Sequence, residues 1–481
     1  MDKKTISALL DQKAGFLNSL SDQIWENPEL AFTEHASAHV LIQALEQEGF
    51  QVSAPIAGVE TAFSGRFGSG KPVIGFLGEF DALSSLNQRA GVSEKAADQP
   101  GGCGHGCGHN NLGVGSLAAA IGVKAYLEAT GKPGTVIYYG CPGEEGGSGK
   151  AFMAREGVFD ELDCAFCWHP GTTNAVTSGS SLANYQILYS FTGVSAHAAG
   201  APHLGRSALD AVELMNVGVN FLREHVIPEA RMHYAITNSG GLSPNVVQPT
   251  ADVLYLLRAP VTSQVQEIYE RVNDIAKGAA LMTGTSVKVK FIKACSNTVL
   301  NRVLEEVLFD NMNQIPLPNY TPEDYAFAKA INESVENRAP AFERLIKRAP
   351  SEEIIAFLRE HEGRDINDFI IPLIHSEQAG GGSTDVGDVS WVCPTAQITT
   401  ATWASATPGH SWQIVAQGKS PLAHKSTLYA GKVLAGAAID LLENPELIEQ
   451  AKAEKCKKLN GASYHCPIPK DVKPTPMGKK M

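Results

Sequence analysis

The chain alternates short apolar runs with longer segments of helical character between residues 72 and about 183. Residues 73–77, 135–139 and 164–168 are almost wholly apolar, which is typical of strands buried on both faces of a parallel sheet. The segment 112–129 is rich in alanine and leucine and predicts a helix. This order predicts an α/β fold with a mostly parallel sheet and helices on both faces.

The pattern changes near residue 184. Six elements are predicted there in the order β-α-β-β-α-β, the ferredoxin-like split motif, at 185–192, 207–222, 231–237, 251–258, 263–282 and 286–292. The earlier pattern returns with a strand at 396–402 and a long helix from about 424 to 442. We therefore expect one domain built from residues 1–184 and 297–481, interrupted by an inserted α+β domain at 185–296. The charged stretch at about 301–375 predicts a helical insertion of unidentified role.

Composition narrows the classes of partner. The 39 basic and 51 acidic residues give a net charge of −12, and no Lys/Arg cluster is present. We therefore expect neither a nucleic acid nor an anionic membrane as partner. Nine cysteines in 481 residues are too few for a disulfide framework and fit a reducing compartment. The apolar stretches are too short for a membrane span, and no secretory signal is evident, so a soluble cytoplasmic protein is expected.

Side chains that bind metals follow directly after the predicted strands. Cys107 and His109 lie in a glycine-rich stretch, Glu144 and Glu145 follow the strand at 135–139, and His169 follows the strand at 164–168. Ligands of open α/β sheets gather beyond the carboxyl ends of the strands. Thiolate and imidazole suit Zn²⁺, and imidazole also accepts Mn²⁺. The sequence therefore predicts one hydrolytic metal site that collects these five side chains.

Adjacent glutamates cannot point in the same direction. One of Glu144 and Glu145 can bind metal, while the other can act as general base toward a metal-bound water. A solvated acidic turn is the alternative, but the position between an apolar strand and Gly146 favours a functional pair.

Four further histidines compete for a fifth ligand position, and spacing does not choose among them: His105, His375, His410 and His424. The cysteines at 164 and 167 would face opposite sides of one strand, so we interpret both as buried apolar residues.

Six motifs together resemble the M20 metallopeptidases, in particular their amidohydrolase branch. They are G-H-G-C-G-H-N at 104–110, P-G-E-E-G-G at 142–147, W-H-P at 168–170, G-V-S-A-H-A-A at 193–199, S-P-N-V-V at 243–247 and G-S-T-D-V-G-D-V-S at 382–390. The resemblance covers almost the whole chain apart from about 305–375.

The resemblance implies two divalent ions, Mn²⁺ or Zn²⁺, in each chain. Cys107 falls on the position of the ligand that bridges them. His109, Glu145, His169 and His410 fall on the other ligand positions, since the last ligand in this family is a histidine in a turn ahead of the final helix.

The other roles are likewise implied by the resemblance. Glu144 falls on the general base, and Asp81 on an acidic residue that supports the metal site. The inserted domain would be a lid and dimerisation module. His197 would reach into the partner subunit's active site and stabilise the oxyanion, while Asn245 and Arg258 would hold a substrate carboxylate.

The implied substrate is an N-acyl amino acid, most specifically p-aminobenzoyl-glutamate, cleaved at its amide bond. The implied assembly is a dimer through the inserted domain, or a heteromer with a homologous second chain. A broader aminoacylase or dipeptidase and a noncatalytic subunit remain alternatives. A purely structural zinc site is disfavoured, because Glu144 would be superfluous to it.

Overall fold

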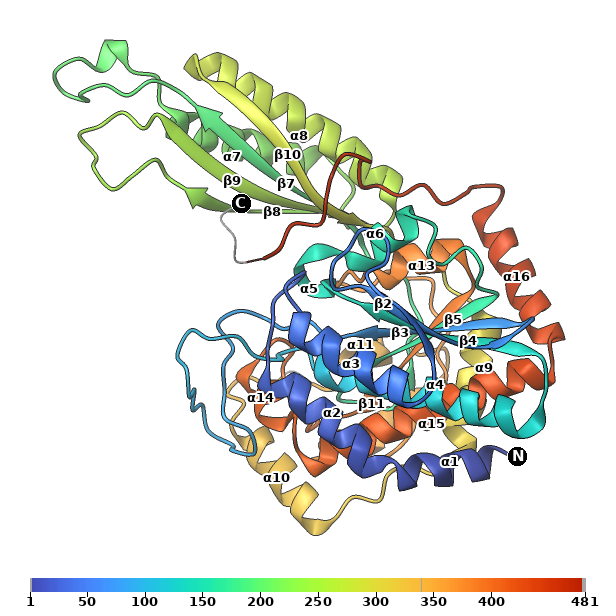
Figure 1. The fold of residues 1–481 in the computed structure, drawn as a ribbon. Coiled ribbons are helices and arrows are strands. Elements are labelled where there is room, and N and C mark those ends of the chain that lie inside the picture. The colour runs from blue at the N-terminus through green and yellow to red at the C-terminus, as the bar shows by residue number, and fades with distance from the viewer. Residues whose placement is uncertain (1, 339, 478–481) are drawn as a thin grey trace.

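The computed structural model describes residues 2–338 and 340–477. The described chain forms a seven-stranded sheet with the order β1-β2-β4-β3-β5-β11-β6 and a four-stranded sheet with the order β10-β7-β9-β8 (Figure 1). The predicted α/β class, with an α+β unit beside the larger sheet, is confirmed.

The larger sheet is parallel at its centre. Its strands are β1 Gln51–Ser53, β2 Phe63–Ser69, β3 Val73–Glu79, β4 Gly134–Cys141, β5 Cys164–Gly171, β6 Ala175–Val176 and β11 Thr395–Ala401. β4, β3, β5 and β11 run parallel, whereas β1, β2 and β6 join by antiparallel pairing. β3 and β4 are buried along their whole length, as expected for strands covered on both faces. The carboxyl ends of the four parallel strands therefore meet at one edge.

Helices cover both faces of this sheet (Figure 1). They include α1 Lys3–Gln12, α2 Ala14–Glu26, α3 His35–Gln47, α4 His109–Thr130, α5 Glu144–Gly147, α6 Gly149–Arg155, α13 Val386–Val392, α14 Trp412–Gln417, α15 Pro421–Glu443 and α16 Glu446–Leu459. α4 packs between the sheet and α15, with Gly431 of α15 close enough that a Cβ there would lie 2.7 Å from Ala118 Cβ. α4 is long and apolar enough to cross a membrane, unlike the expectation, but 78% of its apolar window is buried inside the protein. It is the central core helix.

The smaller sheet forms a separate layer with two helices. It contains β7 Ala183–Thr192, β8 Arg231–Asn238, β9 Thr250–Ala259 and β10 Ser286–Cys295, and its helices are α7 Ala208–Leu222 and α8 Thr262–Thr283. Burial alternates along β9, so that Val253, Tyr255 and Leu257 pack against the helices while their neighbours face outward. Figure 1 shows this unit projecting from the larger one, with β8 at its outer edge.

The stretch after β10 is helical, as expected. It contains α9 Arg302–Gln314, α10 Pro322–Glu333, α11 Glu343–Ile346 and α12 Glu352–Glu360. Phe342, Leu358, Phe369 and Ile371 form a small core of their own. Its contacts with the larger sheet bring one of its side chains close to the site described next.

Candidate metal centre

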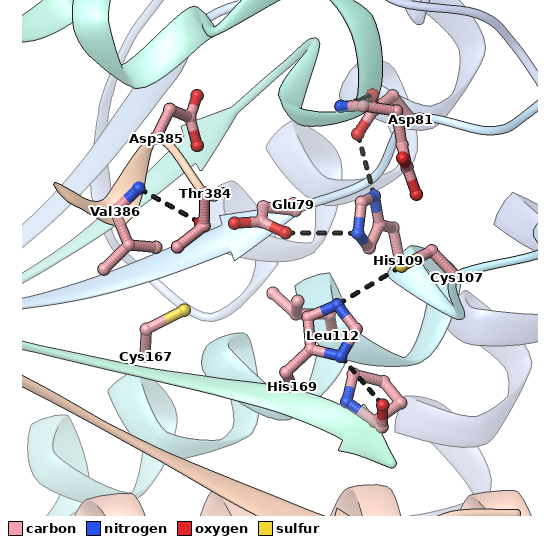
Figure 2. Close-up of polar contacts among 12 residues, drawn as sticks. Glu79, Asp81, Cys107, His109, Leu112, Cys167, His169, Thr384, Asp385 and Val386 are labelled. Atoms are coloured by element: carbon pink, nitrogen blue, oxygen red, sulfur yellow. Dashed lines mark hydrogen bonds and ion pairs between the residues drawn. The ribbon is translucent and has the colours of Figure 1, made fainter. Parts of the chain in front are cut away.

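His109 is fixed at the start of α4 by a buried carboxylate. The helix begins at His109, three residues earlier than predicted, so this side chain occupies the first helical turn. Its Nδ1–H donates to Asp81 Oδ1 at 2.8 Å, just beyond the end of β3 (Figure 2). This hydrogen bond leaves the Nε2 lone pair available, and buried Nε2 makes no hydrogen bond. A carboxylate behind one imidazole nitrogen is the usual arrangement when the other nitrogen binds a metal.

Asp81 also positions a second candidate ligand. Its other oxygen, Oδ2, accepts the backbone N–H of Glu145 at 2.9 Å. Glu145 is in the short helix α5, which begins after Gly143. Gly143 has φ of +68°, and a Cβ there would lie 2.9 Å from the Phe32 ring. A glycine is therefore required to place the glutamate pair at this turn.

Cys107 and His169 face one another from different segments. Cys107 Sγ lies 3.3 Å from His169 Nε2 (Figure 2). His169 is within the last residues of β5, and its Nδ1–H donates to Pro170 O at 2.8 Å, which again frees Nε2. Gly108, between the two candidate ligands of the loop, has φ of +80°, and a Cβ there would collide with the Trp403 ring. The loop can approach the sheet this closely only with glycine at that position.

Two groups of potential ligands share Cys107. The side chains of Cys107, His109 and His169 offer donor atoms within 4.8 Å of one another, and so do those of Cys107, Glu145 and His410. His410 Nε2 lies 3.3 Å from Glu145 Oε1. His410 has φ of +52°, a backbone conformation that costs a non-glycine residue on the order of 1 kcal/mol or more. Such strain is characteristic of side chains held for function.

The donor set fits a pair of divalent cations. Thiolate, imidazole and carboxylate are the ligands of Zn²⁺, and the buried atoms His109 Nε2 and Glu145 Oε1 lack hydrogen-bond partners. Without a cation, burial and the charge of Glu145 raise the pKa of the Cys107 thiol. A bound cation would favour the thiolate.

The charge of Glu144 is set by its neighbours. Glu144, Glu79 and His109 offer atoms within 4.8 Å of one another. Desolvation and the negative charges of Glu79 and Glu145 raise the pKa of Glu144 well above its ordinary value. Burial alone would also raise the pKa of Glu145, but His410 and His109 lower it to about 2. The pair thus divides into a permanent carboxylate and a carboxyl group able to exchange a proton.

A buried lysine that sequence reasoning missed lies behind the site. Lys150 Nζ is 2.6 Å from Glu79 Oε1 and 2.6 Å from Asp385 Oδ1. Glu79 Oε2 in turn is 3.2 Å from His109 Nε2 (Figure 2). Burial would lower the pKa of Lys150, but the two carboxylates raise it well above its ordinary value. Lys150 therefore stays charged and holds Glu79 against the site.

The other three competing histidines have different partners. His105 is buried, with Nε2 at 3.0 Å from Ile24 O. His375 Nδ1 lies 2.8 Å from Glu305. His424 Nε2 lies 2.9 Å from Asp22. Cys164 and Cys167 are buried in the core, as interpreted from the sequence.

The predicted residues of the smaller unit lie at opposite ends of it. His197 follows β7 and pairs with the loop that carries Asn245, because Ala198 N–H donates to Asn245 O at 2.9 Å. Arg258 lies at the other end of β9, where its Nη1 donates to Ser383 Oγ at 3.1 Å. About eight residues of extended strand, roughly 27 Å, separate Arg258 from the Asn245 loop. One chain therefore does not bring Asn245 and Arg258 together.

His197 and Arg258 are both available for a ligand. Backbone N–H groups of Ala199 and Gly200 donate to His197 Nδ1 at 3.2 and 3.0 Å, so Nε2 carries the proton and points away from these bonds. Within the described ranges, no acidic side chain lies within ion-pair distance of Arg258.

Comparisons with known proteins agree with this arrangement. The model of Peptidase family M20/M25/M40 matches residues 75–362. The chain is 47% identical over 460 residues, 95% of both chains, to a component of the p-aminobenzoyl-glutamate hydrolase of Escherichia coli that is named as one of its subunits. It is 29% identical over 470 residues, 95% of this chain and 92% of the relative, to the Xaa-Arg dipeptidase of Mus musculus. A dinuclear metal-binding M20 peptidase of Bacillus subtilis shares the fold, with a TM-score of 0.52, 17% identity and coverage of 92% and 99% of the two chains.

Proposed function

Because this chain belongs to Peptidase family M20/M25/M40, we propose that it is a metal-dependent amidohydrolase that cleaves p-aminobenzoyl-glutamate into p-aminobenzoate and glutamate. The observation that carries the mechanism is Cys107, which belongs to two ligand groups at once. We assign Cys107, His109 and His169 to one divalent cation and Cys107, Glu145 and His410 to the other, either Mn²⁺ or Zn²⁺. Asp81 orients one ligand of each group.

When bound, a pair of such cations lowers the pKa of an attacking water and polarises the amide carbonyl. Glu144 is the general base in this proposal. It takes the proton of the attacking water and delivers it to the nitrogen of the leaving glutamate. Its raised pKa supports this role, since a carboxylate of ordinary pKa is a weaker base and a poor proton donor at neutral pH.

The substrate carboxylate and the oxyanion need donors, and the smaller unit supplies them. We assign Arg258 to the α-carboxylate, because a guanidinium without an acidic partner can bind it through two hydrogen bonds. His197 Nε2–H would donate to the oxyanion. Since His197 and Asn245 share one loop pair far from Arg258, we propose that both enter the site from a second subunit.

The smaller unit would accordingly serve as lid and dimerisation module, spanning 185–296 between two parts of the catalytic domain at 1–184 and 297–481. The partner is a second copy or a homologous chain, since the Escherichia coli relative is itself named as a subunit. All nine cysteines are free thiols, which supports a reducing compartment such as the cytoplasm.

Turnover by a base-deficient variant tests this function. Glu144→Gln removes the base but no metal ligand, so we expect two cations per chain and a kcat on p-aminobenzoyl-glutamate at least ~1,000-fold below wild type. Glutamate release and metal content are the measurements. A variant with near-wild-type kcat would reject Glu144 as the base, and a wild-type enzyme that leaves this substrate intact would reject the function.

A further inference from the structure

A cavity of about 310 Å³ adjoins the candidate metal centre. β11 pairs with β5 in parallel register, which places Gln397 beside Cys167 and Thr399 beside His169. Paired residues of neighbouring strands point to the same face of a sheet. Gln397 lines the cavity, so the cavity lies on the same face as His169, roughly 8 Å away by strand spacing and rise. That separation is within reach of one amino-acid residue of a bound substrate.

The walls are formed mainly by small polar residues of two loops, 177–181 and 380–384. Ser383 of the second loop accepts the hydrogen bond from Arg258 Nη1. The cavity therefore begins where the proposed α-carboxylate site ends. A side chain on the same amino acid would point into it.

One guanidinium reaches the cavity from the helical insertion. Arg348, just after α11, lies between the two loops: its Nη2 donates to Ala379 O at 3.4 Å, and its Nη1 stands 3.5 Å from where Gly179 would carry a Cβ. Across the described residues, no carboxylate lies within ion-pair distance of Arg348. A half-buried guanidinium with unfilled donors favours a planar anion such as a carboxylate.

Among the described residues that line the wall, the only other charged side chain is Glu305. It is engaged by His375, whose Nδ1 lies 2.8 Å from Glu305 Oε2. Burial raises the pKa of Glu305, which disfavours a free negative charge here. Arg348 is thus the charge of this wall that has no counter-charge among the described residues.

We propose that this cavity is the subsite for the side-chain carboxylate of an acidic amino acid, and that Arg348 binds that carboxylate. The inference rests on the proposed function, because it assumes that the amino-acid part of the substrate occupies Arg258. p-Aminobenzoyl-glutamate has two free carboxylates, both on glutamate. Arg258 would bind the α-carboxylate and Arg348 the γ-carboxylate, so the helical insertion would set the preference for glutamate.

The test compares two substrates that differ only at the γ position, p-aminobenzoyl-glutamate and p-aminobenzoyl-glutamine. Arg348→Met should lower kcat/KM for the glutamate substrate about 10- to 100-fold, the usual effect of losing a hydrogen bond between charged groups, and change the glutamine substrate less than about 3-fold. Arg359→Met, at an exposed arginine of α12, is the matched control and should change neither. Equal losses on both substrates, no loss on the glutamate substrate, or a wild-type enzyme that does not prefer the glutamate substrate would overturn the proposal.

Binding separates failure of the subsite from failure of the proposed function. Calorimetry on the metal-loaded full chain should show L-glutamate binding more tightly than L-glutamine, with that difference lost in Arg348→Met. This result would support the subsite even if neither acyl substrate were hydrolysed. Equal glutamate affinity in wild type and variant would overturn it even if both substrates were hydrolysed.

Discussion

At the scale of single residues, burial decides which side chains stay charged and which hold a proton. Asp81 uses both carboxylate oxygens, one for His109 and one for Glu145. Lys150 balances Glu79 and Asp385 in the interior, where a lone charge would be costly. Removing either kind of support would leave a neighbouring candidate ligand without its fixed orientation.

Asp388 shows the same principle away from the candidate metal centre, and it should make stability depend on pH. Its carboxyl accepts from Ser296 N, Ser296 Oγ and Tyr464 OH, and burial raises its pKa to about 7. The folded state therefore holds the proton more tightly than the unfolded state. This stabilisation is complete below about pH 4 and is lost as pH rises to about 7, at up to about 1.4 kcal/mol per pH unit.

Asp388→Asn cannot titrate, so the free energy of unfolding of wild type minus that of the variant should fall as pH rises from about 4.5 to about 7. Urea denaturation at several pH values measures this difference. Asp98→Asn, at an exposed loop position, is the control and should give a flat difference. A difference for Asp388→Asn that is equally flat would contradict the assignment.

The sequence predicted most candidate ligands because each follows an apolar strand and carries distinctive chemistry. It could not predict Lys150, since a lysine is rarely buried without a partner and its partners Glu79 and Asp385 are far apart in the chain. Arg348 was missed for a similar reason. Its position beside Gly179 depends on how the insertion packs, which no local pattern records.

At the scale of elements, the short helix α5 carries both glutamates and is covered by the C-terminal segment. Arg155 Nη1 donates to Pro469 O and Val472 O at 2.9 Å, and Met477 N–H donates to Ala31 O at 3.0 Å. A Cβ on Gly146 of α5 would collide with Met477 Sδ. Figure 1 shows this segment running from α16 past α6 toward the smaller unit. It therefore acts as a strap over the turn that positions the proposed general base.

A chain that ends at Ala462 should retain its two cations but lose roughly 10- to 100-fold in kcat, the usual cost of a small misplacement of a catalytic group. A chain that ends at Met477 keeps every described contact and serves as control. Steady-state kinetics together with metal analysis would check this. Full kcat in the shorter chain would show that α5 needs no strap.

Elements were predicted best where burial imposes a period. The apolar runs at 73–77 and 135–139 became β3 and β4, and the β-α-β-β-α-β order became the four-stranded sheet with α7 and α8. The ends of elements were predicted less well. β5 continues through His169 to Gly171, because its pairing with β11 extends that far and hydrogen bonding between strands is not visible in one strand's sequence.

At the scale of the whole molecule, the smaller unit exposes apolar side chains that a single chain leaves in water. Val217 and Phe221 of α7 are 50% and 70% exposed, and Tyr234 and Ile236 of the edge strand β8 are 41% and 45% exposed. An unpaired edge strand with apolar neighbours is a natural surface for a second chain. This surface supports the proposed dimer.

Mixing two inactive variants tests whether subunits share active sites. Glu144→Gln and His197→Ala should each be nearly inactive alone. In dimers formed by random reassociation, about half contain one of each variant, and one of their two sites has both intact residues, so the mixture should recover about a quarter of wild-type activity. Remixing either variant with itself is the control. A mixture as inactive as its parents would place His197 in its own subunit's site.

The central claim is that Cys107 joins two cations, and anomalous diffraction from crystals loaded with Mn²⁺ or Zn²⁺ tests it most directly. The account predicts two peaks per chain, each within coordination distance of Cys107 Sγ, about 2.3 Å for zinc. One peak should lie against His109 and His169, and the other against Glu145 and His410. A single peak, or a second peak remote from the Cys107 sulfur, would contradict the account.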